Sequence, residues 1–266
     1  MLSSYNPESI GEEIRQHEVI PVKNVFVVMP AYNAGKTIER VFSRIPSQVK
    51  ERINRYIIVD DGSTDDTQEA LNRLRADYPD LITLKHEINR GYGAAEKTIL
   101  NCALKEGADI AILLHADGQY SPEKIPDLLT PFERNHADIV QGSRILGKGA
   151  LKGGMPVYKF MANKCLTVIE NAAFRMHMAE FHSGYMVYSR KALTEIPFNK
   201  LSDSFQFDLE MLVMAKIKGL RITEVPIPTI YADEVSHLKP VKYGFDVLSV
   251  VWDYLTGKYH VINDNR

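Results

Sequence analysis

Three residues that could hold a divalent cation alternate along one short stretch of the chain. His115, Asp117 and Gln119 follow the apolar run 110–114 and precede a helix start at residues 121–123. Such an apolar run indicates a buried parallel strand, and ligands of open α/β sheets collect beyond the carboxyl ends of these strands. If the chain stays extended, alternating side chains point to one side, and this mixed set suits a cation that also binds phosphate oxygens. A polar turn with His115 packed locally explains the stretch equally well.

Two consecutive aspartates stand at the end of another apolar run. Asp60 and Asp61 follow residues 56–59 and precede a helical pattern that begins at residue 69. One carboxylate is enough to cap the first free amides of a helix, so a second one favours ligand binding. Carboxylates at the end of a parallel strand can accept hydrogen bonds from a base N–H group or from a ribose hydroxyl.

A third loop, at residues 89–93, could bring a positive charge and accessible backbone amides to the same end of the expected sheet. Arg90 can approach a diphosphate, and Gly91 and Gly93 allow a close approach of the backbone. A metal ion at Asp117 would bridge the same diphosphate and neutralise charge on a departing phosphate.

These loops need a parallel sheet to bring them together, and the first half of the chain has the pattern of one. Strand-like apolar runs alternate with helical segments, which is typical of a doubly wound parallel sheet. The expected strands cover residues 25–29, 56–59, 82–84, 109–114 and 138–141, and the expected helices cover residues 37–45, 69–78 and 122–134, with another that ends near Gly107. We therefore expect an α/β fold with a single Rossmann-like, mostly parallel sheet flanked by helices.

The second half of the chain reads as an elaboration of the same domain. It is expected to contain a basic glycine-rich loop at 147–154, helices at 157–175, 205–218 and 241–255, and strands at 185–188 and 222–227. No linker rich in Ser, Pro or Gly separates the two halves. The last helix is apolar on more than one face, which favours burial against a partner subunit or the core over a membrane-surface helix.

Whole-chain composition excludes several classes of protein. The chain has 266 residues, 45% of them hydrophobic, with a net charge of −2 and a pI near 6.5. That balance argues against nucleic acid as a partner. Cys102 and Cys165 lack metal-ligand spacing and are expected to be reduced. Without a long apolar span or a signal peptide, we expect a cytoplasmic protein that at most lies peripherally on the inner face of a membrane.

Four motifs occur in a fixed order at the expected strand ends. They are Pro30-Ala31-Tyr32-Asn33, residues 59–65 (VDDGSTD), residues 89–93 (NRGYG) and Ala116-Asp117-Gly118-Gln119. This set resembles the signature motifs of family 2 glycosyltransferases, and the chain is most similar to the dolichol-phosphate-mannose-synthase-like branch over residues 22–240. Residues 142–144, 182–185, 207–210 and 224–228 also fit the pattern. The resemblance implies the GT-A fold of nucleotide-diphospho-sugar transferases and an inverting reaction.

The resemblance also implies roles for particular residues. The nucleotide sugar would be held by Pro30, Ala31, Tyr32, Asn33, Asp60, Asp61, Arg90, Gly91, Ala116 and Asp117. A Mn²⁺ or Mg²⁺ cofactor would be bound by Asp117 with Gln119, His115 and His237, and the acceptor by Arg144, Lys148 and Lys152. Asp208 would be the general base. The implied donor is a UDP-sugar first and GDP-mannose second, and the acceptor is a polyprenyl phosphate, a lipid-linked or a saccharide acceptor in envelope glycan synthesis.

This chain departs from the family pattern at three places. His115 replaces the first aspartate of the metal-binding D-x-D motif, although imidazole can ligate Mn²⁺. Tyr231 and the Ser236-His237 pair stand where the branch has an arginine and a Ser-Lys pair, which weakens the expectation of a polyprenyl-phosphate acceptor. His237 could close over the metal or be an ordinary histidine.

Two other functions compete with this one. A catalytically silent nucleotide-sugar-binding protein is the main alternative, because His115 replaces a metal carboxylate. A nicotinamide oxidoreductase is disfavoured, because the first strand is not followed by G-x-G-x-x-G.

The expected organisation has a polar leader at 1–20, a nucleotide-sugar half at 22–145, an acceptor half at 146–240, and a C-terminal helix and tail at 241–266. The expected partners are a nucleotide sugar and a lipid-phosphate or glycan acceptor, with peripheral membrane contact and a homodimer as further expectations.

Overall fold

A computed structural model of the chain describes residues 23–147, 149–151, 153–229 and 240–264. The predicted leader, Lys148, Lys152 and His237 lie outside these residues.

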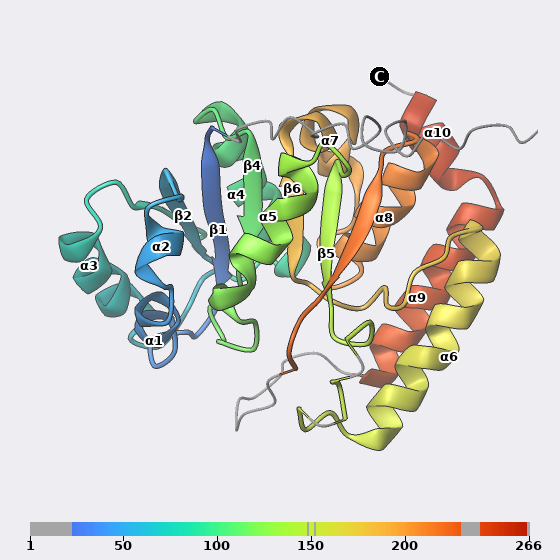
Figure 1. The fold of residues 1–266 in the computed structure, drawn as a ribbon, viewed down its shortest axis with the longest axis horizontal. Helices are drawn as coiled ribbons and strands as arrows, with labels where there is room; N and C mark the ends of the chain where they lie inside the picture. Colours follow the sequence, from blue (N-terminus) through green and yellow to red (C-terminus); the bar gives the residue numbers. More distant parts are fainter. Residues whose placement is uncertain (1–22, 148, 152, 230–239, 265–266) are drawn as a thin grey trace, which may run out of the picture.

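The described chain forms one sheet in the strand order β3-β2-β1-β4-β6-β5-β7 (Figure 1). The strands are β1 (Val25–Ala31), β2 (Arg55–Asp60), β3 (Ile82–Lys85), β4 (Ile110–Leu113), β5 (Ile139–Ser143), β6 (Met186–Ser189) and β7 (Ile222–Pro226). The first four strands are parallel to one another, and β5 is parallel to β7. The predicted α/β fold with a mostly parallel sheet is confirmed.

The strand β6 runs antiparallel to both of its neighbours, β4 and β5. Its position was predicted, but its direction was not. An apolar run has the same pattern in either direction, so only the tertiary structure fixes how it pairs.

Helices cover both faces of the sheet. They are α1 (Ile38–Ser43), α2 (Ser47–Lys50), α3 (Thr67–Asp77), α4 (Tyr92–Lys105), α5 (Ile125–Glu133), α6 (Val157–Phe174), α7 (Arg190–Glu195), α8 (Phe207–Ile217), α9 (Pro240–Leu255) and α10 (Lys258–Asp264), with short 3₁₀ turns at Pro122–Lys124 and Phe198–Lys200.

Alternate residues of each strand enter different halves of the core. In β1, Phe26 and Val28 pack on the side of α4 and α8, while Val27 and Met29 pack on the side of α1, α3 and α5. This period of two is the reason that the central strands are apolar throughout, since both faces are covered.

The helices α6 and α9 pack against each other and lie side by side at one end of the molecule (Figure 1). One face of α9 is buried through Val247, Val250 and Val251, so the predicted burial against the core is confirmed for that face. A second face of α9, which carries Phe245 and Trp252, stays exposed. No helix among the described residues is long and apolar enough to cross a bilayer.

Candidate active site

The loops predicted to carry the chemistry meet at one edge of the sheet. Ala31 at the end of β1 is in register with Asp60 at the end of β2, and the Asp61 amide donates to the Ala31 carbonyl at 2.8 Å. Beside them, the Leu114 amide donates to the Val28 carbonyl at 3.0 Å, which brings in the end of β4. Parallel strands place their carboxyl ends at a common edge, and that geometry gathers the motifs.

The loops after β1 and β2 are tied together through Asn33. The Asn33 amide donates to Ser63 Oγ, and the Thr64 amide donates to Asn33 Oδ1, both at 2.9 Å. Asn33 has a left-handed backbone with φ of 51°, which asparagine tolerates better than most residues. The ring of Tyr32 stays 37% exposed beside this turn, and Asp60 is buried with its Oδ1 accepting from the Ser63 amide at 2.9 Å.

Asp61 is occupied with holding the next loop. It is 3% exposed, and its carboxylate accepts from the Arg90 and Gly91 amides, each at 3.0 Å. The ring of His86 lies 2.6 Å from the same carboxylate through Nδ1. Asp61 therefore sets the position of the Arg90 loop, while the Arg90 residue itself is exposed at the surface.

The glycines of this loop also have a packing role within the protein. A Cβ on Gly91 would lie 2.5 Å from the Asp203 carbonyl, and one on Gly93 would lie 2.5 Å from the Ser202 carbonyl. Gly91 also has φ of 99°. The close approach that these glycines allow is to the protein's own backbone ahead of α8.

The chain does not stay extended after β4, so the assumed alternation of His115, Asp117 and Gln119 is wrong. A turn follows, with φ of 80° at Gly118, and the Gln119 amide donates to Asp117 Oδ1 at 2.9 Å. The ring of His115 packs between aromatic residues, with centroids 4.9 Å from Tyr120 and 5.5 Å from Tyr92. Burial lowers the pKa of His115, although nearby Asp117 works in the opposite direction, so the imidazole is neutral at pH 7.

The side chains near Asp117 fit a metal ion that takes only some of its ligands from the protein and the rest from a bound substrate. Within the described residues, no group of three or more His, Cys, Asp or Glu side chains could hold a metal alone. One carboxylate with a neutral imidazole and an amide nearby leaves most positions of a Mn²⁺ or Mg²⁺ ion for diphosphate oxygens and water, which is how Mg²⁺ is usually bound at phosphate sites.

The predicted base, Asp208, lies in the first turn of α8. It is 7% exposed. Tyr92 donates to its Oδ2 at 2.8 Å, and Tyr188 donates to its Oδ1 at 3.2 Å. The Tyr92 oxygen also lies 3.0 Å from His115 Nε2, so a continuous polar chain connects Asp208 with the end of β4.

A second buried carboxyl group lies next to Asp208. Glu96, in α4, is completely buried, and burial together with the charge of Asp208 raises its pKa well above the ordinary value. Burial also raises the pKa of Asp208, to about 6. Two carboxyls this close do not ionise together easily, and we place the proton on Glu96 because two tyrosines stabilise the Asp208 anion.

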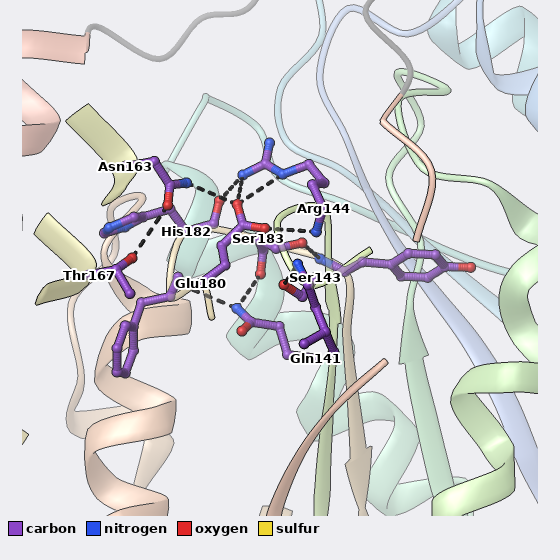
Figure 2. Close-up of polar contacts among 12 residues, drawn as sticks. Gln141, Ser143, Arg144, Asn163, Thr167, Glu180, His182 and Ser183 are labelled. Atoms are coloured by element: carbon purple, nitrogen blue, oxygen red, sulfur yellow. Dashed lines mark hydrogen bonds and ion pairs between the residues drawn. The ribbon is translucent and has the colours of Figure 1, made fainter. Parts of the chain in front are cut away.

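Arg144 is held by a buried carboxylate that the sequence did not reveal (Figure 2). Glu180 is fully buried and accepts from the Arg144 amide at 2.8 Å and from Arg144 Nε at 3.0 Å. Asn163 of α6 donates to the same carboxylate at 3.0 Å, and Arg144 also donates to the His182 carbonyl at 2.6 Å. Burial tends to raise the pKa of Glu180, but the Arg144 charge outweighs it, so the pKa lies below its ordinary value.

His182 lies next to the cluster of Arg144, Glu180 and Asn163, and its ring contacts one residue of α6 and one of α9. Its Nε2 lies 3.0 Å from the carboxylate of Glu170 in α6, and its Nδ1 lies 3.2 Å from the hydroxyl of Tyr243 in α9. Glu170 and Glu180 escaped the sequence analysis because a glutamate in or near an amphipathic helix normally reads as a solvated residue.

Comparison with known proteins agrees with this architecture. Residues 26–196 match the profile described as Glycosyl transferase family 2. The chain is 32% identical to the UDP-N-acetylglucosamine–dolichyl-phosphate N-acetylglucosaminyltransferase of Methanococcus voltae, over 79% of this chain and 87% of that protein. It is 25% identical to the polyprenol monophosphomannose synthase of Mycolicibacterium smegmatis, over 79% of this chain and 78% of that protein.

A solved structure has the same fold. Glucosyl-3-phosphoglycerate synthase from Mycobacterium tuberculosis, in complex with Mn²⁺, uridine diphosphate and phosphoglyceric acid, matches with a TM-score of 0.65 at 21% identity, covering 88% of this chain and 79% of that one. The solved structure shows that the chain has the GT-A fold, and the profile match with the Methanococcus relative shows that it belongs to the family 2 glycosyltransferases.

Proposed function

We propose that this chain transfers a hexose from a nucleotide-diphosphate sugar to the phosphate of a polyprenyl phosphate, with inversion at the anomeric carbon. A UDP-sugar is the first choice of donor and GDP-mannose the second. The relatives named above support a polyprenyl-type phosphate acceptor, and their donors differ in base and sugar.

The observation that carries the choice of acceptor is the state of Asp208. A general base has to reach the proton that it removes, at hydrogen-bond distance. Asp208 is buried, and each of its oxygens already accepts a hydrogen bond from a tyrosine. A saccharide hydroxyl would need such a base, whereas a phosphate monoester is an anion at pH 7 and needs none.

The reaction is then a single displacement. A phosphate oxygen of the acceptor attacks the anomeric carbon and forms the new C–O bond, while the bond from that carbon to the donor diphosphate breaks and the nucleoside diphosphate leaves with the electron pair. A divalent cation held by Asp117, with His115 or Gln119 beside it, would supply positive charge to the leaving diphosphate.

The chain's own residues position the two substrates in this proposal. The turn of Tyr32 and Asn33 with Asp60 receives the nucleoside, and Asp61 orients the loop that presents Arg90 to the diphosphate. Arg144, fixed by Glu180, presents positive charge to the acceptor phosphate, and Lys148 and Lys152 belong to the same loop in sequence. His237 remains a proposed metal ligand.

Ligand-dependent thermal stability tests the donor site first. Melting temperatures would be measured with UDP, GDP, CDP and dTDP, each with Mn²⁺, Mg²⁺ or EDTA, because a ligand that binds only the native state raises the melting temperature. We expect a metal-dependent rise with one diphosphate. Transfer from the matching sugar donors to a short polyprenyl phosphate in detergent would follow.

Asp117→Ala is the variant that separates the competing functions. It should abolish transfer while the melting temperature without ligand is unchanged. Retained transfer in this folded variant would contradict the assigned site. Diphosphate binding by the wild type without transfer or hydrolysis, whichever metal is added, would favour the catalytically silent binding protein instead.

A further inference from the structure

Phe205 is an aromatic residue that the fold leaves at the surface next to the candidate site. It lies in the turn just ahead of α8 and is 36% exposed, whereas Phe207, two positions later, is fully buried. Pockets for small substrates are lined largely by apolar and aromatic side chains, so an exposed ring at this position points to a contact with a substrate.

One face of the Phe205 ring is covered by Tyr92. The two rings are stacked, with centroids 5.3 Å apart and planes inclined by 21°. The Tyr92 ring also meets the His115 ring, at a centroid distance of 5.5 Å, and His115 stands two positions before Asp117. Because Tyr92 covers one face, the exposed area of Phe205 comes from its edge and its opposite face. That free face lies one ring away from the residues near Asp117.

Tyr92 holds the Phe205 ring in place. Its hydroxyl donates to Asp208 Oδ2 at 2.8 Å and lies 3.0 Å from His115 Nε2. A phenol fixed through its oxygen cannot turn away without losing these contacts, so the stacked pair keeps one arrangement before any substrate binds. A side chain that is already ordered loses less conformational entropy when it makes a new contact.

The turn that carries Phe205 is fixed to the donor side of the site. The Gly93 amide donates to the Asp203 carbonyl at 3.0 Å, which joins this turn to the start of α4. In the proposed function, the loop just before α4 presents Arg90 to the diphosphate. The side chain of Arg144, proposed for the acceptor phosphate, is instead held by the segment that precedes β6. The position of Phe205 therefore favours the donor over the acceptor.

The sugar of the donor is the part of a substrate that fits an aromatic face here. The proposed function places the diphosphate at Asp117, and the sugar is bonded to the phosphate at the end of that diphosphate. A pyranose ring has C–H groups on its faces and hydroxyl groups around its edge. The face of an aromatic ring is negative and attracts such C–H groups, and the contact also removes apolar surface from water.

We propose that Phe205 stacks on the sugar ring of the nucleotide-sugar donor. This inference rests on the proposed function for the presence of that donor. The contact involves the sugar and not the nucleoside diphosphate, so it separates the affinity for the sugar nucleotide from the affinity for the diphosphate alone.

Calorimetric titration of the full chain with matched ligands tests the contact. UDP would be compared with UDP-glucose and UDP-N-acetylglucosamine, and GDP with GDP-mannose, each with Mn²⁺. Phe205→Ala should weaken binding of the sugar nucleotide by roughly three- to tenfold, the size of one aromatic contact, and leave binding of the diphosphate unchanged. Phe205→Tyr keeps the ring and should bind both ligands as the wild type does.

Phe245→Ala is the matched control. It is the same substitution at a ring of α9 that is 69% exposed, and it should leave both affinities unchanged. Equal melting temperatures without ligand would show that the variants are folded.

Steady-state kinetics separate a contact with the sugar from a contact with the acceptor. A contact made equally in the ground state and the transition state changes KM and leaves kcat unaltered. For Phe205→Ala we expect a higher KM for the sugar nucleotide, with kcat and the KM for a short polyprenyl phosphate unchanged. A rise in the acceptor KM alone would place the ring against the acceptor and overturn the proposal.

The remaining outcomes distinguish this inference from the proposed function. Equal losses of affinity for the diphosphate and the sugar nucleotide would show that Phe205 only supports Tyr92, and the proposal would be wrong. Unchanged affinities in Phe205→Ala, while the wild type transfers sugar, would overturn the stacking contact alone. If Phe205→Ala weakens only the sugar nucleotide but no sugar reaches a polyprenyl phosphate, the contact stands and the proposed function is lost. A wild type that binds none of the sugar nucleotides would overturn both.

Discussion

Tyr92 donates a 2.8 Å hydrogen bond to Asp208 across 116 positions of the chain. The same phenol oxygen lies 3.0 Å from His115 Nε2. The Tyr92 hydroxyl therefore lies between the Asp208 carboxylate and the His115 ring. The aspartate predicted to be a base is thus linked through Tyr92 to the residue that replaces a metal carboxylate.

The variant Asp208→Asn distinguishes a positioning role from a base. With a phosphate acceptor, we expect turnover to fall by less than about tenfold, because loss of a true general base costs about 10²–10⁴-fold. Steady-state kinetics with a short polyprenyl phosphate would measure it. A fall of the larger size with donor affinity preserved would restore the base role, and Tyr92→Phe should reproduce the small effect if Asp208 acts through Tyr92.

The buried pair of Glu96 and Asp208 predicts how stability depends on pH. Their pKa values are raised in the folded state, so the folded state holds more protons than the unfolded one, and stability falls as pH rises from the ordinary carboxyl range near 4 through about 6 and above. Glu96→Gln cannot ionise and resembles the protonated carboxyl. We expect it to match the wild type near pH 5 and to melt at a higher temperature at pH 8.

Thermal melts of both proteins across that pH range would measure the difference between them. Glu96→Ala is the matched control, since it also removes the charge but leaves a cavity and should be destabilised at every pH. A Glu96→Gln protein that is less stable than the wild type at pH 8 would mean that the Glu96 anion is needed.

The sequence alone predicted which loops form the site, because their positions depend only on where the strands end. A strand pattern ending at Asp60 or just before His115 places these residues at a common edge, because every parallel strand ends there. Local apolar patterns therefore located the sheet and the motif loops. They could not predict the reversal of β6, since the pattern of Met186–Ser189 is independent of direction.

The hydrogen bonds of the site were beyond the sequence because they join distant segments. Asp61 was predicted to contact a ligand, and its sequence position gave no sign that its oxygens also accept from amides 29 and 30 positions away. Glu96 sits in a helix with ordinary amphipathic spacing, and only the packing of α4 against α8 shows that it is buried. Side chains that support other side chains leave no local pattern.

The ion pair of Arg144 and Glu180 should be costly to break from the buried side. Glu180→Ala removes the carboxylate that receives the Arg144 amide, the Arg144 guanidinium and Asn163. Removing one partner of a buried pair costs about 3–5 kcal/mol. At about 2–4 °C per kcal/mol for chains of this size, the melting temperature should fall by roughly 6–20 °C.

Glu133→Ala is the control for this prediction, because Glu133 pairs with Arg52 at a site where both side chains are partly exposed. Surface pairs contribute about 0–1 kcal/mol, so its melting temperature should change little. Equally small changes in melting temperature for the two variants would show that water can solvate Arg144 once Glu180 is removed.

Gly91→Ala tests whether the loop of Arg90 must pack against the backbone ahead of α8. An added Cβ would lie 2.5 Å from the Asp203 carbonyl, at a backbone with φ of 99°. Gly219→Ala measures the cost of a positive φ without a close contact, since Gly219 has φ of 68° and no atom within 4 Å of the added Cβ, whereas Gly91 combines its φ of 99° with a ψ of 159°. Left-handed backbone strain alone costs roughly 1–2 kcal/mol, so Gly219→Ala should lower the free energy of unfolding by about that much.

Gly91→Ala should lower the free energy of unfolding by more than that. It should also weaken diphosphate binding, because the loop that presents Arg90 has to move. Thermal melts with and without the diphosphate measure both effects, and equal losses for the two variants with unchanged binding would show that the loop adjusts freely.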